Sequence, residues 1–108
     1  FLNAVDGTHA GAVAVSLISI SDDGERKALF TAESDAHGRF SHDFDAVNGQ
    51  TYEMVIASGA YFKTANLPRS GAQILDEIVV RFTTPDPDSR YHIPVIMAPN
   101  SYSCWWSA

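Results

Sequence analysis

The chain has one cysteine, few basic residues and no long apolar run. Cys104 is the only cysteine among 108 residues, which excludes an internal disulfide and a zinc site built from several cysteines of one subunit. No apolar stretch approaches the ~20 residues that span a bilayer, and no charged-then-apolar leader precedes the first predicted strand. We therefore expect a soluble protein without a membrane partner.

Acidic residues outnumber basic ones. The chain has 13 Asp and Glu against seven Lys and Arg, which are scattered along it, and its net charge is −6. This charge opposes the phosphate backbone, so no nucleic-acid partner is expected. The length and the 45% apolar content fit one domain, residues 1–108. A lone cysteine suits a reducing compartment, such as the cytoplasm or a peroxisome, while secretion stays open because a leader can precede Phe1 in a longer chain.

Alternating apolar residues predict short β-strands. The clearest case is 75–83, where Ile78, Val80 and Phe82 fall on one face. Further strands are expected at 12–20, 28–33, 51–57, 91–97 and 101–106, separated by turn signals at 21–27, 34–40, Asn48-Gly49 and 84–89. A helical turn or two is predicted within 59–67, and Pro68 discourages its continuation. The fold class is therefore an all-β sandwich with one short helix.

Several longer motifs carry a family resemblance. They are "YEMVIASGAYFKT", "ILDEIVVRFTTPDPDSRYHIPVIMAPNSYS", "SDAHGRF" and the opening "NAVD". In this order they resemble transthyretin and the 5-hydroxyisourate hydrolases that share its fold. The resemblance implies a transthyretin-like (prealbumin-like) two-sheet β-sandwich that pairs edge strands into a dimer. Two dimers are then expected to form a homotetramer around a channel that binds a small-molecule substrate or ligand.

The resemblance also implies site residues. In the hydrolase branch the site looks like a His in an opening His-x-x-Asp, an Arg in Asp-Gly-Arg, the His of Tyr-His-x-Pro and a C-terminal Tyr-Arg-Gly-Ser. Arg39 in "AHGRF" and His92 in "YHIP" match this pattern and are the predicted catalytic residues. Asn3 stands where the first His would be, and it is a predicted substrate-binding residue.

The C-terminal segment departs from the hydrolase pattern. The residues in place of Tyr-Arg-Gly-Ser are Trp105, Trp106, Ser107 and Ala108. Strand alternation places Ser103, Trp105 and Ser107 on one face, which the resemblance implies faces the channel. Tyr102, Cys104 and Trp106 take the other face unless the terminus bends. Ser103, Trp105 and Trp106 are the further predicted substrate-binding residues, and the alternative is that both indoles only pack in the core or a dimer interface.

These departures change the available chemistry. An imidazole side chain can accept and donate a proton, whereas the amide of Asn3 cannot act as a base. A guanidinium binds an oxyanion, but the indole of Trp106 offers a π surface instead. Losing a positioned acid or base costs ~10²–10⁴ in rate. We therefore expect the natural substrate to differ from 5-hydroxyisourate.

No metal or other cofactor is expected. His9, His37 and His42 lie in or beside polar segments without metal-ligand spacing. Cys104 invites comparison with the cysteine–histidine pairs of hydrolases, but strand alternation and the resemblance predict a buried packing residue.

Three functions remain open at this point. The first is a diverged enzyme that opens or closes a ring in a small aromatic or heterocyclic substrate by proton transfer, with secondary metabolism as one setting for it. The second is hydrolysis of 5-hydroxyisourate itself in purine breakdown. The third is a non-catalytic carrier of flat hydrophobic ligands.

Overall fold

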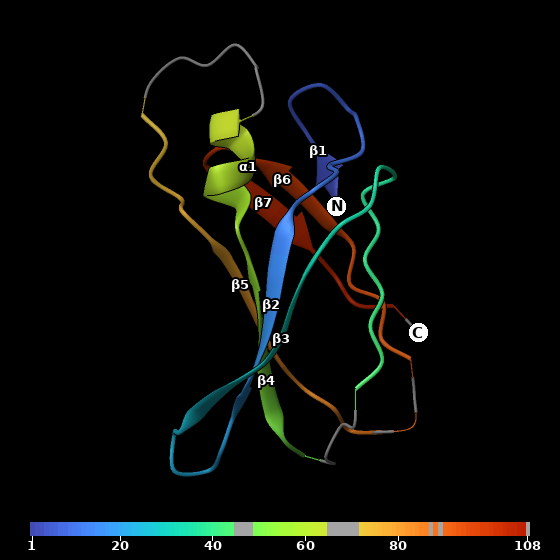
Figure 1. The fold of residues 1–108 in the computed structure, drawn as a ribbon, viewed down its shortest axis with the longest axis vertical. Coiled ribbons are helices and arrows are strands. Elements are labelled where there is room, and N and C mark those ends of the chain that lie inside the picture. Colours follow the sequence, from blue (N-terminus) through green and yellow to red (C-terminus); the bar gives the residue numbers. More distant parts are fainter. Residues whose placement is uncertain (45–48, 65–71, 87, 89, 108) are drawn as a thin grey trace.

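The computed structural model describes residues 1–44, 49–64, 72–86, 88 and 90–107 (Figure 1). The elements in chain order are β1 (Leu2–Asn3), β2 (Ala14–Ile20), β3 (Arg26–Glu33), β4 (Thr51–Ile56), α1 (Ser58–Thr64), β5 (Ile78–Thr83), β6 (Val95–Ala98) and β7 (Ser101–Cys104). The predicted β-sandwich with one short helix is confirmed. No helix of the described part is long and apolar enough to cross a membrane.

The strands form two sheets. One has the order β1-β6-β7, in which β1 is parallel to β6 and β7 is antiparallel to β6. The other is antiparallel throughout, with the order β3-β2-β4-β5. Helix α1 lies at one end of the sandwich, and the turn between β2 and β3 lies at the opposite end (Figure 1). The outermost strands are β1 and β7 in one sheet and β3 and β5 in the other. Within the described residues, no strand pairs with the outer side of β5 or of β7.

Alternating apolar residues of both sheets form the core. Val15 and Leu17 of β2 are buried, and so are Val95 and Met97 of β6. Phe62 of α1 is also buried and closes one end of this core. Each such side chain contributes roughly 1.5–3 kcal/mol on burial. The face predicted for β5 is confirmed, because Ile78 is buried, and Val80 and Phe82 pack against the core.

Several predicted strand boundaries were wrong, including the start of β2 (14 instead of 12) and of β3 (26 instead of 28), and β1 was not predicted. Strand β5 begins at Ile78 instead of 75, because the N–H groups of Ile74 and Leu75 donate to Asn100 Oδ1 instead of a neighbouring strand. Strand β6 begins at Val95 instead of 91, since Pro94 has no N–H to donate to a ladder. Strand β7 ends at Cys104 instead of 106 for the same reason, as its partner segment contains that proline. The predicted turn residue Asn48 and the predicted helix breaker Pro68 lie outside the described residues.

An ion-pair triad lies on the outer face of the larger sheet. The Glu53 carboxylate on β4 is paired with Arg26 of β3, and its Oε2 accepts from Nε and Nη2 of Arg81 on β5, at 2.9 and 2.8 Å. The Glu53 side chain keeps only 6% of its surface exposed. The hydrogen bonds from Arg26 and then Arg81 hold the pKa of Glu53 below its ordinary value of 4.5.

We expect Glu53→Gln to lower the free energy of unfolding at pH 7 by about 1–2 kcal/mol, because it removes charge-assisted hydrogen bonds. A carboxylate with a lowered pKa stabilises the fold above its unfolded-state pKa, and this stabilisation is lost as the pH falls through the folded-state pKa. The difference in melting temperature between wild type and Glu53→Gln should therefore shrink from pH 7 toward pH 3. A constant difference over this range would show that the charge of Glu53 is not what matters.

Candidate functional site

The outer face of the smaller sheet collects predicted site residues. Strands β6 and β7 pair in a register that places Ile96 opposite Ser103. An isolated antiparallel bridge between His92 and Ser107 continues the same register beyond Pro94. Because side chains alternate along each strand and opposed residues share a face, His92, Ser103, Trp105 and Ser107 lie on one side of this sheet. The alternation predicted from the sequence therefore holds past the end of β7.

His92 and Ser107 are joined by both backbone and side chains. The N–H of His92 donates to the carbonyl of Ser107 at 3.1 Å, and the N–H of Ser107 donates to the carbonyl of His92 at 2.8 Å. Their side chains meet at 3.1 Å between Nδ1 and Oγ. His92 is exposed, and within the described residues no hydrogen bond occupies its Nε2. Sequence reasoning placed Ser107 on this face but missed its contact with His92, because pairing across Pro94 was not foreseeable.

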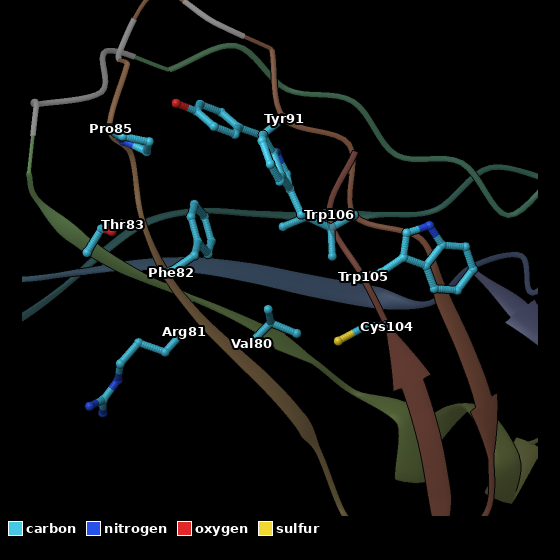
Figure 2. A pocket seen from close by; sticks show the side chains of 10 residues that line it. Val80, Arg81, Phe82, Thr83, Pro85, Tyr91, Cys104, Trp105 and Trp106 are labelled. Carbon is cyan, nitrogen blue, oxygen red and sulfur yellow. The ribbon is translucent and has the colours of Figure 1, made fainter. Parts of the chain in front are cut away.

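The two indoles separate. Trp105 is 50% exposed and extends away from the side chains of Val80 and Phe82 (Figure 2). Trp106 is 61% exposed and lies beside Tyr91, with 6.2 Å between ring centroids. Trp105 therefore lies on the same face of the sheet as His92, whereas Trp106 lies on the opposite face. The structure does not bring Trp106 to His92, so this geometry does not favour the predicted contact of Trp106 with a substrate.

A cavity of about 380 Å³ opens between the two sheets, at the edge formed by β5 and β7. Its lining residues are Val80, Arg81, Phe82, Thr83, Pro85, Tyr91, Ile93, Cys104, Trp105 and Trp106 (Figure 2). Most of this wall is apolar or aromatic. Cys104 is partly buried here and packs against the core, in line with the packing role predicted for it. It also lies on the face opposite His92, so the two do not form a nucleophile–base pair.

Asn3 is placed apart from His92. It is 1% exposed and is paired with the buried Met97 in the parallel β1–β6 register. Its Oδ1 accepts from the N–H of Val5 at 2.9 Å, and its Nδ2 donates to the hydroxyl of Tyr61 at 3.3 Å. A buried amide with both ends bonded serves the fold, so this geometry does not favour the predicted substrate contact.

Arg39 follows a tight reversal after β3. The Asp35 carboxylate accepts from the backbone N–H groups of His37 and Arg39 at 2.8 and 2.9 Å. The bond from Arg39, aided by that from His37, holds the pKa of Asp35 below its ordinary value. Arg39 is exposed, and no contact between its guanidinium and His92 occurs in the described part of one chain. Its catalytic role stays a prediction.

The remaining histidines lie at the surface, as expected. His9 and His37 approach edge to face, with 6.3 Å between ring centroids. His42 stacks on Phe30 at 3.8 Å. Over the described ranges, no group of three or more His, Cys, Asp or Glu side chains is placed to hold a metal ion.

Comparison with known proteins gives consistent matches. The model of the HIUase/Transthyretin family matches residues 1–106. A 5-hydroxyisourate hydrolase from Caulobacter vibrioides is 31% identical over 107 residues, covering 96% of this chain and 90% of that protein. 5-hydroxyisourate hydrolase 2 from Rhizobium meliloti is 36% identical over 55 residues, which cover 51% of this chain and 46% of that protein.

Solved structures agree on the fold. Sea bream transthyretin in complex with thyroxine superposes with a TM-score of 0.81 at 23% identity, covering 98% of this chain and 89% of that one. The crystal structure of (S)-allantoin synthase gives a TM-score of 0.83 at 24% identity over 99% of this chain, which corresponds to only 41% of that one. At these identities the similarity is one of fold alone.

Proposed function

The chain belongs to the HIUase/Transthyretin family, and on that premise we propose that it is a diverged enzyme of this family. In this proposal His92 is the acid/base residue, and the substrate is a flat heterocycle held against Trp105. One observation carries the proposal: an exposed imidazole and a half-exposed indole lie on one face of the β1-β6-β7 sheet. An aromatic plane for stacking beside an imidazole that can give and take a proton suits such a substrate.

The reaction class that we propose is ring opening by water, or its reverse. His92 Nε2 takes a proton from the attacking water as the new C–O bond forms. The same proton then passes to the ring nitrogen that departs as the C–N bond breaks. This cycle needs no other proton carrier, and a residue of imidazole basicity can give and take the proton at neutral pH.

Assembly extends the proposed site. The exposed large apolar side chains include Val79 on β5, Tyr102 on β7 and both indoles, all on or next to the edge strands β5 and β7. Such exposure supports pairing with further copies, and we propose a homotetramer with the face of His92 lining a shared channel. Within this assembly Arg39 of another subunit would polarise the carbonyl oxygen of the substrate, because it does not reach His92 within its own chain.

Two other functions have support from the comparisons. The names of the curated relatives favour hydrolysis of 5-hydroxyisourate itself. The thyroxine complex of sea bream transthyretin favours a non-catalytic binder of flat ligands. The enzyme proposal ranks above the binder because a binder has no need for an exposed histidine.

Paired tryptophan variants test the proposed site. With 5-hydroxyisourate as the first probe, we expect Trp105→Ala to raise KM, or Kd if no turnover occurs, by about twofold to twelvefold, since an aromatic contact contributes ~0.5–1.5 kcal/mol. Trp106→Ala is the matched control on the opposite face, and it should change the same KM or Kd less than about twofold. A larger effect of Trp106→Ala than of Trp105→Ala would place the ligand on the opposite face from His92 and would reject this site.

A further inference from the structure

We propose that Ser107 is a positioning residue for His92, which holds the imidazole with Nε2 directed to the substrate. This inference rests on the proposed function and deepens it. The contact that carries it is the 3.1 Å approach of Ser107 Oγ to His92 Nδ1. One ring nitrogen is thereby occupied by the protein, and the other stays available.

Backbone hydrogen bonds hold His92 and Ser107 in place for this side-chain contact. His92 and Ser107 exchange both backbone hydrogen bonds, so their Cα atoms are held in the hydrogen-bonded pair of an antiparallel ladder. Pro94 interrupts the ladder between this bridge and β6. The bridge therefore restrains the segment that carries His92. It also places the hydroxyl of Ser107 opposite the imidazole of His92.

The chemistry of a hydroxyl fits this role. Ser107 Oγ can accept from Nδ1–H when the imidazole is neutral and also when it is protonated. The ring therefore needs no reorientation when Nε2 gains or loses its proton. When it accepts from Nδ1–H, the hydroxyl supports that tautomer, and because it is uncharged it lacks the strong preference for imidazolium that a carboxylate partner would impose.

Nuclear magnetic resonance of the His92 ring tests the contact without a substrate. In the wild type we expect the neutral ring to carry its proton on Nδ1, and in Ser107→Ala this tautomer should lose its dominance. Ser107→Thr keeps the hydroxyl and should restore it. Ser101→Ala is the matched control, because it removes a hydroxyl six residues away on the same face, about 20 Å along the strand. An unchanged tautomer in Ser107→Ala would overturn the proposal.

Kinetics separate this inference from the proposed function. Where turnover is measured, Ser107→Ala should lower kcat about tenfold with KM changed less than about twofold, as expected for one lost hydrogen bond. Ser107→Thr should recover most of kcat. Equal kcat in wild type and Ser107→Ala would reject the positioning role. A tautomer change in a protein that turns over no substrate would instead reject the enzyme proposal and leave the contact established.

Discussion

Replacing His92 by asparagine is expected to lower kcat by ~10²–10⁴, because the proposed proton transfer loses its acid/base group. Asparagine keeps a polar side chain of similar reach but neither takes nor gives a proton at useful rates. Because His92 is exposed, its substitution is not expected to unfold the protein, so unfolding would not explain the lower kcat. Turnover of 5-hydroxyisourate or of a related cyclic amide, followed by ultraviolet absorbance, measures the effect.

The same variant distinguishes the three candidate functions. In a non-catalytic binder, His92→Asn should leave the affinity for a flat ligand within about a factor of three. A plain 5-hydroxyisourate hydrolase should lose turnover of that compound, whereas a diverged enzyme should turn it over poorly even as the wild type. Thermal unfolding provides the control, since an exposed substitution is expected to change stability by less than about 0.5 kcal/mol. Full activity of a folded His92→Asn would contradict the proposed acid/base role.

Gly38→Ala is expected to destabilise the fold by ~3–5 kcal/mol, the range of severe single substitutions. Gly38 has a φ of 70°, which costs an L residue roughly 1–2 kcal/mol. An added Cβ would also overlap the backbone carbonyl oxygen of Phe1 and lie 3.1 Å from the backbone nitrogen of Ala10. Neither neighbour is a flexible side chain that can move aside, so the backbone itself must shift.

Gly24→Ala separates the cost of a positive φ from the cost of overlap with neighbouring atoms. Gly24 has a φ of 87°, but nothing lies within 4 Å of an added Cβ. Its substitution should therefore cost only the conformational part, roughly 1–2 kcal/mol. Thermal or urea unfolding of both variants measures the difference, which we attribute to the close approach of Phe1 and Ala10. Equal destabilisation of the two variants would mean that the backbone of Phe1 and Ala10 moves aside from the added Cβ at little energetic cost.

The fold was largely predictable from the sequence. Val15 and Leu17 in β2, and Ile78, Val80 and Phe82 in β5, recur at every second position and face the core, and this alternation survives folding because one face of each strand is buried. The motifs around "GAYF" and "YHIP" predicted a short helix and a following strand in the right order. The boundaries of β6 and β7 were wrong because Pro94 removes a donor in one strand and thereby affects its partner.

The candidate site was predictable only in part. Placing Trp105 on one face and Trp106 on the other needed nothing but the two-residue period of a strand. The burial of Asn3 depends on the parallel register between β1 and β6, and a shift of one residue would have turned it to the opposite face. Nothing in the local sequence specifies that register.

By itself the sequence determined the strand pattern, the family, and the side of its terminal strand on which each indole lies, because these depend on local periodicity and on motifs read in order. Only the tertiary structure decided that Ser107 meets His92, that Asn3 is buried against Met97, and that Glu53 joins Arg26 and Arg81. These contacts join residues between 15 and 94 positions apart in the chain. Their partners are chosen by sheet register and closure of the sandwich, which are properties of the whole chain.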